Sequence, residues 1–142
     1  MAWHIGVILF LDACIVVYWI EAPDPFHARL MKRFGALRNR YPDASFAVSR
    51  LSWMECMVKP MRDSDQALID VYRAFFDAGQ LRVIELTASV VEQATLLRAK
   101  HGMKTPDALQ AACALELGGD CLFLTNDSGF KKVPGFQVEI PA

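Results

Sequence analysis

Two kinds of hydrophobic pattern alternate along the chain. Short runs in which nearly every residue is apolar are typical of buried strands, whereas apolar residues spaced three and four positions apart are typical of amphipathic helices. The runs predict strands at 7–11, 44–48, 81–86 and 121–125, with a short edge strand at 136–140. The periodic segments predict helices at 13–20, 27–40, 52–58, 63–76, 87–100 and 105–117. Strands and helices in this order predict an α/β fold, in which right-handed crossovers build a parallel sheet with helices on both faces.

Proline, glycine and hydroxyl residues predict where several helices begin and end. The segment 21–25, which contains two prolines, interrupts the chain after the first helix. Pro60 is expected to end the helix that starts at Ser52, and Gly79 is expected at the C′ position after the helix 63–76. Thr105 followed by Pro106 predicts an N-cap and the first helical residue.

The composition indicates one well-cored domain that spans residues 1–142. Of the 142 residues, 54% are hydrophobic and 22% are charged, and the formal net charge of −1 argues against strong nonspecific binding of nucleic acid through bulk charge. One basic cluster departs from this average, with near-helical spacing, at Arg29, Lys32, Arg33, Arg38 and Arg40. The cluster is either a solvated helix face or a track for a phosphate backbone, and the sequence leaves both open.

The cysteines and the apolar N-terminal stretch bear on the compartment. The four cysteines, at positions 14, 56, 113 and 121, show no CxxC spacing, which favours reduced, buried thiols in a cytoplasmic protein. The apolar stretch 5–20 resembles a signal peptide or membrane anchor, but it lacks a basic flank and carries Asp12 in its middle. A carboxylate at the centre of a bilayer costs about 2.5–3.5 kcal/mol, so we expect neither.

Four carboxylates stand where predicted elements meet, and each has a local explanation. Asp12 directly follows the first strand and is placed to cap the next helix. Glu55 lies three residues after Ser52, which is the spacing of a capping box. Asp107 suits the first turn of a helix, and Asp127 lies in a segment of turn composition. Together, however, these acids are predicted to reach the carboxyl edge of one parallel sheet, which is where ligands bind in such folds.

Four carboxylates in one cleft would repel one another unless a cation neutralised them. An all-oxygen ligand set favours Mg²⁺ or Mn²⁺ over zinc, and carboxylate-held Mg²⁺ commonly contacts substrate phosphates. This chemistry suits the hydrolysis of phosphodiesters. The three histidines lie in no motif and the chain has no glycine-rich phosphate loop, so a zinc hydrolase, a Ser-His-Asp triad and a nucleotide-binding loop have no support.

Four segments resemble the PIN-domain family of the VapC toxin type, over nearly the whole chain. They are Phe10-Leu11-Asp12-Ala13-Cys14 with Tyr18, Ser49-Arg50-Leu51-Ser52-Trp53-Met54-Glu55-Cys56, Lys104-Thr105-Pro106-Asp107-Ala108-Leu109, and Phe123-Leu124-Thr125-Asn126-Asp127. Cys14 stands where the family often has asparagine, and Gln110 stands where it often has histidine. Neither departure affects an acid, although either would alter substrate contacts.

The resemblance implies a three-layer α/β/α sandwich with a central, mostly parallel sheet of four to five strands. It also implies a Mg²⁺- or Mn²⁺-dependent endoribonuclease, the toxin of a type II toxin–antitoxin pair, that forms a homodimer and is inhibited by an antitoxin whose tail occupies the active-site groove. Asp12 and Asp107 would be the main metal ligands, with Glu55 and Asp127 completing the acidic pocket. Thr125 and Asn126 would orient the acids, and metal-activated water would attack RNA in line at phosphorus.

Two other functions and two other surfaces remain as alternatives. An inactive PIN-fold interaction module is disfavoured because all four acids are present. A phosphotransferase with Asp12 as nucleophile is disfavoured because such enzymes commonly have a second acid two residues on, where this chain has Cys14. The large side chains Trp19, Trp53, Met54 and Met57 are expected in the core, with a dimer or antitoxin surface as the alternative.

Overall fold

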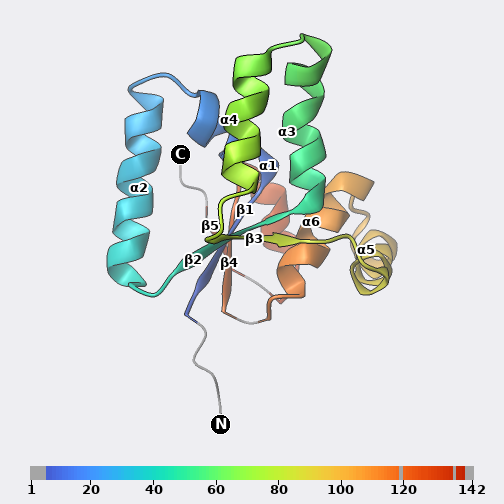
Figure 1. The fold of residues 1–142 in the computed structure, drawn as a ribbon. Helices are drawn as coiled ribbons and strands as arrows, with labels where there is room; N and C mark the ends of the chain where they lie inside the picture. Colours follow the sequence, from blue (N-terminus) through green and yellow to red (C-terminus); the bar gives the residue numbers. More distant parts are fainter. Residues whose placement is uncertain (1–5, 119, 136, 140–142) are drawn as a thin grey trace.

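The computed structural model describes residues 6–118, 120–135 and 137–139. Its centre is a five-stranded sheet in the order β3-β2-β1-β4-β5, in which every pair of neighbouring strands is parallel (Figure 1). The strands are β1 (Ile8–Leu11), β2 (Ser45–Ser49), β3 (Leu81–Ile84), β4 (Cys121–Leu124) and β5 (Gln137–Glu139). The helices are α1 (Ala13–Glu21), α2 (Phe26–Arg40), α3 (Arg50–Arg62), α4 (Gln66–Phe76), α5 (Ala88–His101), α6 (Thr105–Leu115) and the short 3₁₀ helix η1 (Ser128–Lys132).

Side-chain alternation along β1 builds a core on each face of the sheet. Leu9 and Leu11 pack among buried residues of α1, α2, α3 and α4, whereas Ile8 and Phe10 pack among buried residues of α5, α6 and η1. All four residues of β1 are buried, as expected for a central strand covered on both sides. The predicted three-layer α/β/α architecture with a parallel sheet is therefore confirmed.

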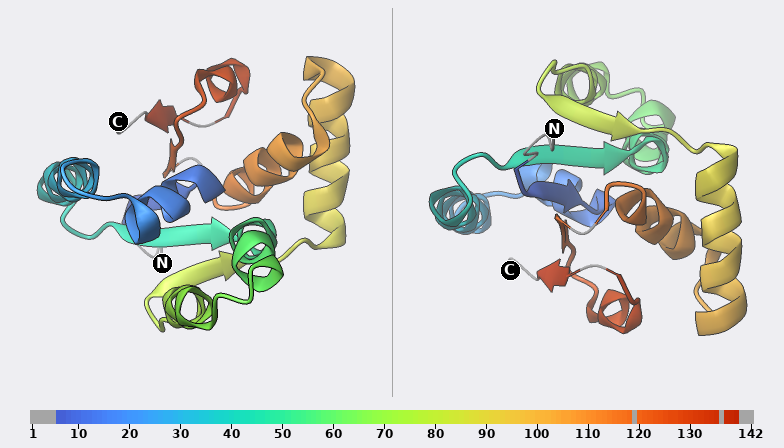
Figure 2. Two further views of the ribbon diagram at one scale, coloured as in Figure 1. Left: turned by 90° about the horizontal axis from the view of Figure 1, so that it is seen from above. Right: turned by 90° about the horizontal axis from the view of Figure 1, so that it is seen from below.

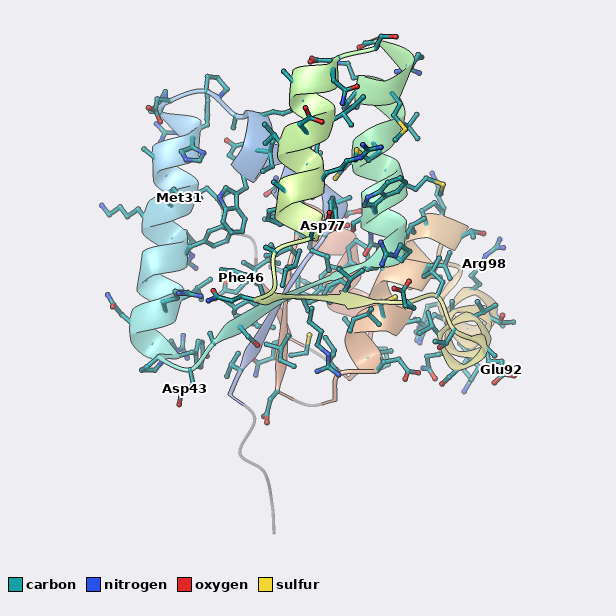
Figure 3. All side chains as sticks on the ribbon, viewed as in Figure 1. Met31, Asp43, Phe46, Asp77, Glu92 and Arg98 are labelled. Carbon is teal, nitrogen blue, oxygen red and sulfur yellow. The ribbon has the colours of Figure 1, made fainter. Side chains whose placement is uncertain are left out.

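Helices α2 and α5 lie at opposite ends of the molecule. In both views of Figure 2, α2 and α5 lie at opposite ends of the strands, and β2 runs from the side of α2 toward the side of α5. Figure 3 shows the same separation through Met31 on α2 and Glu92 on α5. Because the basic cluster of the sequence lies on α2, this arrangement bears directly on its role.

The ends of α3 differ from the prediction at both termini. Ser49 is the N-cap, and its hydroxyl accepts a hydrogen bond from the backbone of Ser52 at 3.1 Å. The helix therefore begins at Arg50, two residues before the predicted start, and the proposed capping box of Ser52 and Glu55 is wrong. The helix also continues through Pro60 to Arg62, because a buried proline near the last turn forfeits only one backbone hydrogen bond.

The ends of α4 and α6 also shift. Asp65 caps α4 by accepting from the backbone of Leu68 at 3.1 Å, so α4 begins at Gln66 rather than at residue 63. The C-cap of α4 is Asp77, so Gly79 is not its C′ residue. Lys104, not Thr105, occupies the N-cap of α6, which shifts the predicted start by one residue. Of the predicted last strand, residues 137–139 form β5, and residues 136 and 140 lie outside the described part of the chain.

Of the residues expected in the core, four are buried, Trp19 and Trp53 are partly buried against the core, and Cys14 and Met54 are exposed. Cys56, Cys113 and Cys121 are buried, and burial raises the pKa of each thiol to about 12, which makes them unreactive. Cys14 is exposed, contrary to the expectation of buried thiols. Met57 is buried but Met54 is 53% exposed, so Met54 is not a core residue. No helix in the described ranges combines the length and the apolar character needed to cross a membrane.

Candidate active site at the carboxyl edge of the sheet

Asp12 is held at the end of β1 by three donors. Its Oδ1 atom accepts a hydrogen bond from the backbone of Ala13 at 2.8 Å. Its Oδ2 atom accepts from the hydroxyl of Thr125 at 2.7 Å and lies 3.6 Å from the Cys14 sulfur. Thr125 is fully buried and follows β4, which pairs directly with β1. Asp12 therefore caps α1, which is the local explanation that the sequence offered. Its side chain is also held in one orientation by Thr125, which follows the neighbouring strand β4.

Glu55 is hydrogen-bonded to a buried polar network that the sequence did not reveal. Its Oε1 atom accepts a hydrogen bond from the side-chain amide of Gln110 at 3.1 Å. The same amide group donates to the hydroxyl of Ser52 at 2.8 Å, and the Gln110 carbonyl accepts from the hydroxyl of Ser49 at 2.9 Å. Ser49 and Ser52 are fully buried and Gln110 is 2% exposed. The only sign of this network in the sequence is a pair of serines three residues apart, Ser49 and Ser52, within a buried segment.

Asp107 and Asp127 line one cavity of about 290 Å³ near the start of α6. Asp107 lies in the first turn of α6, and its carboxylate accepts no hydrogen bond from the described residues. Asp127 caps η1 by accepting from the backbone of Gly129 at 2.8 Å. Lys104 and Lys132 line the same cavity, which places two ammonium groups beside the two carboxylates.

Electrostatic coupling links three of the acids to their neighbours. Burial raises the pKa of Asp12, and the charge of Asp107 raises it further. Burial also raises the pKa of Glu55, with contributions from Asp12 and Asp107. The pKa of Asp107 is raised by burial and by the charge of Asp127. Asp12, Glu55 and Asp107 are therefore each disfavoured as charged groups by at least one other acid, with Asp127 acting on Asp107.

This geometry is accompanied by a family match that covers most of the chain. Residues 9–135 match the PIN domain. The chain belongs to the PIN-domain family. The predicted family is therefore confirmed.

Solved structures with the same fold come from toxin–antitoxin systems. One is VapBC2 from Rickettsia felis bound to a DNA fragment from its promoter, with 21% sequence identity and a TM-score of 0.67 over 93% of this chain and 97% of that chain. Another is a toxin–antitoxin complex from Klebsiella pneumoniae, with 20% identity and a TM-score of 0.67 over 94% and 98% of the two chains. At these identities the likeness concerns the fold. The search of curated proteins finds no match.

In this PIN domain the four acids lie at the same edge of the sheet but do not form a complete metal-binding site by themselves. Within the described ranges, no three histidine, cysteine, aspartate or glutamate side chains lie close enough together to hold a metal ion. Asp107 and Asp127 line the cavity, whereas Asp12 and Glu55 do not. Magnesium sites commonly use only one or two carboxylates and complete their coordination with water and substrate oxygens. The all-oxygen donor set and the unbonded carboxylate of Asp107 fit such an ion.

The two residues expected to orient the acids differ in what they contact. Thr125 donates to Asp12 and also accepts a hydrogen bond from the backbone of Asp127 at 3.1 Å, so one hydroxyl joins two acids. Asn126 is exposed, and its backbone N–H is directed at the Cys14 sulfur. Cys14 in turn lies 3.8 Å from the hydroxyl of Thr125. The thiol that replaces the family's frequent asparagine is therefore part of the hydrogen-bonded surroundings of Asp12.

Proposed function

We propose that the chain is a VapC-type toxin that cleaves RNA internally with the help of Mg²⁺ or Mn²⁺ and acts in the cytoplasm. One observation carries this proposal. At the carboxyl edge of a PIN-domain sheet, the charges of Asp12, Glu55 and Asp107 are each disfavoured by a neighbouring acid, and Asp107 has no hydrogen-bond donor among the described residues. A divalent cation would relieve this repulsion, and it is the partner that such an oxygen-only site binds.

The family resemblance supports Asp12 and Asp107 as the main metal ligands, and the contacts suggest roles for the neighbouring residues. Asp12 and Asp107 would hold the cation, with Asp127 completing the pocket from the same cavity as Asp107. When bound, the ion would supply Lewis acidity and stabilise the charge that develops on the phosphate oxygens. Gln110 holds Oε1 of Glu55, which leaves Oε2 free to accept a proton from the attacking water. The hydroxyl of Thr125 keeps Asp12 in one orientation during the reaction.

Cleavage of RNA by the purified chain tests this proposal. We expect hydrolysis with Mg²⁺ or Mn²⁺, no hydrolysis in EDTA, and recovery when the metal is restored. Asp107→Asn should lower kcat by at least about 100-fold, because it removes a charged ligand but no hydrogen bond that the structure shows. Glu92→Gln is the matched control, since Glu92 is an exposed carboxylate on α5. Equal rates for wild type and Asp107→Asn would refute the assignment, and a fully inactive wild type would favour the interaction module instead.

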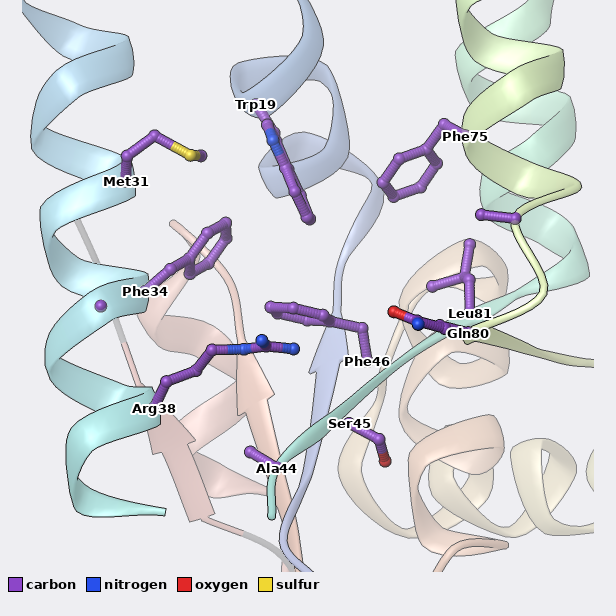
Figure 4. A pocket seen from close by; sticks show the side chains of 12 residues that line it. Trp19, Met31, Phe34, Arg38, Ala44, Ser45, Phe46, Phe75, Gln80 and Leu81 are labelled. Atoms are coloured by element: carbon purple, nitrogen blue, oxygen red, sulfur yellow. The ribbon is translucent and has the colours of Figure 1, made fainter. Parts of the chain in front are cut away.

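A second surface supports the proposal of an antitoxin partner. A groove of about 850 Å³ lies between α2 and α4 with Trp19 of α1 at its base (Figure 4). Its walls are mainly apolar, and Arg38 lies at its edge, 5.2 Å from the ring centre of Phe46. The structures from Rickettsia felis and Klebsiella pneumoniae are described as toxin–antitoxin complexes or as VapBC. We propose that an apolar segment of an antitoxin, with acidic residues toward Arg38, fills this groove.

Gly35 offers a clean test of the groove. It lines the groove from α2, and a Cβ atom placed on it would meet nothing within 4 Å. Gly35→Leu should therefore fill the groove without straining the helix, and it should weaken the binding of a co-expressed antitoxin. Gly35→Ala is the control and should bind normally. Undiminished binding by Gly35→Leu would contradict the proposal. We also propose that the chain forms a homodimer.

A further inference from the structure

The nuclease proposed above needs to accept a negatively charged phosphate beside four carboxylates. Four carboxylates carry a formal charge of −4, and one divalent cation leaves −2. An RNA phosphodiester would still be repelled by that net charge. Positive side chains near the acids are therefore required, and the sequence suggested the basic cluster of α2 for this purpose.

The structure gives the cations of α2 other partners. Arg33 forms an ion pair with Glu139 at 3.2 Å. The guanidinium groups of Arg29, Arg38 and Arg40 each lie over an aromatic ring, at 5.6, 5.2 and 5.3 Å from the ring centres. Helix α2 also lies at the opposite end of the molecule from the α5–α6 pair, where the cavity of Asp107 begins (Figure 2). The α2 cluster is therefore poorly placed to neutralise a phosphate at the acids.

Lys104 and Lys132 meet the requirement. Both side chains are exposed, and both line the cavity that Asp107 and Asp127 share. Their positive charges lower the pKa of Asp107, against the effects of burial and Asp127. Neither lysine forms an ion pair within the described part of the chain, so both ammonium groups are available to a ligand. They approach the cavity from two elements, the N-cap of α6 and the end of η1.

We propose that Lys104 and Lys132 bind a phosphate of single-stranded RNA in the cavity of Asp107 and Asp127. With one divalent cation on the four acids, the two ammonium groups bring the formal charge of the site to zero before the phosphate enters. The two lysines act on binding and position, and they are not assigned a proton-transfer step. This inference rests on the proposed ribonuclease activity for its biological meaning, but RNA binding can be measured without cleavage.

The experiment compares the salt dependence of RNA binding in Lys→Gln variants of the full chain. A fluorescent single-stranded RNA oligonucleotide is titrated at a fixed Ca²⁺ concentration, which keeps a divalent cation at the acids in the absence of the Mg²⁺ or Mn²⁺ proposed for cleavage. Each phosphate contact contributes about 0.7 to the slope of log K against log salt. Because the two lysines share one phosphate, the double variant should lower the slope by about 0.7, and Lys104→Gln and Lys132→Gln should each account for part of that decrease. For each phosphate contact that is lost, a fourfold rise in salt should weaken RNA binding about 2.6-fold less than it weakens binding by the wild type.

Two controls make the result specific. Lys131→Gln removes the same charge one residue before Lys132, on an exposed side chain that does not line the cavity. Lys32→Gln tests the α2 cluster. Both should keep the wild-type slope. With metal present, the cavity variants should raise KM by about fivefold or more and leave kcat within about twofold.

The outcomes separate the two proposals. If wild type does not cleave RNA but the cavity variants still lower the salt slope, the ribonuclease proposal fails and the lysine assignment stands. If wild type cleaves RNA and Lys104→Gln and Lys132→Gln match Lys131→Gln in slope and KM, the lysine assignment is overturned. A fall in slope for Lys32→Gln alone would likewise overturn it in favour of α2.

Discussion

Replacing Gln110 by leucine tests whether the buried network beneath Glu55 stabilises the fold. The substitution keeps a side chain of similar size but removes three hydrogen bonds, to Ser49, Ser52 and Glu55. The hydroxyls of Ser49 and Ser52 are fully buried, so water cannot replace the lost partner. The Glu55 end is exposed and contributes little, because solvent can take over that hydrogen bond.

The expected loss follows from these contacts. The hydroxyls of Ser49 and Ser52 lie 3.4 Å apart, and Ser49 still accepts from the backbone of Ser52, so the pair is left with about one buried hydroxyl short of a partner. That costs about 1–3 kcal/mol. Leucine recovers up to roughly 1 kcal/mol through its greater apolar burial, which gives a net loss of about 1–2 kcal/mol. For a domain of this length, that loss corresponds to a decrease in Tm of about 3–7 °C.

Urea unfolding at constant m-value measures this loss, with Gln66→Leu as the matched control. Gln66 is exposed on α4, and its side chain makes only one intrahelical hydrogen bond, to Asp70 at 2.8 Å. The control should lose at most about 0.5 kcal/mol. In a double-mutant cycle, Gln110→Leu and Ser52→Ala should together cost at least about 1 kcal/mol less than their sum, because they remove a shared bond. A loss below about 1 kcal/mol for Gln110→Leu, or strict additivity, would refute the reasoning.

Three further expectations concern backbone, charge and assembly. Gly102 ends α5 at a φ of 63°, so Gly102→Ala should lower the free energy of unfolding in urea by about 1 kcal/mol. Gly35→Ala within α2 should raise it by about 0.5–1 kcal/mol, because nothing lies within 4 Å of the added Cβ. Changes of the same sign for both variants would contradict this expectation. Burial and the charge of Asp127 raise the pKa of Asp107 in the folded chain above its value in the unfolded chain. Between these two pKa values the folded chain binds more protons than the unfolded chain. The stability of the metal-free protein should therefore fall as pH rises through this window. Asp107→Asn should flatten this fall in EDTA, and an unchanged profile would count against the coupling. The exposed apolar stripe on α3 consists of Met54, Val58 and Met61. If it is the homodimer contact, Val58→Asp should halve the molar mass measured by light scattering, and an unchanged dimer would place the contact elsewhere.

The order and type of the elements followed from the sequence because each pattern has one physical cause. A strand covered on both faces needs a continuous apolar run, as in β1 and β4, and both runs became strands buried at all four residues. The helix ends were harder to predict, because they depend on which of several similar residues acts as the cap. Ser49 and Ser52 are equally suited to cap α3 by type, and the structure uses Ser49 as the cap and buries Ser52 against Gln110.

The candidate site was likewise predicted only in part. Strand direction alone brings Asp12 and the segment of Thr125 to one edge, and the hydrogen bond between them confirms that part. Gln110 was missed as a supporting residue because its partners lie 58 and 61 positions away along the chain. The role of the α2 cluster stayed open for the same reason, since helical spacing determines which residues share a face but not which end of the sheet the helix covers.

The contrast between Asp12 and Asp107 is the strongest physical argument that the site serves a ligand. Three donors stabilise Asp12, so its partial burial has a structural explanation. Asp107 lies in a cavity, its pKa is raised by burial and by Asp127, and no described residue donates a hydrogen bond to it. A carboxylate there lowers the stability of the chain by itself, and asparagine would keep the shape without the charge. The two lysines of the cavity only partly offset these effects, so the carboxylate is suited to a partner from outside the chain, and we propose a hard cation together with a phosphate as that partner.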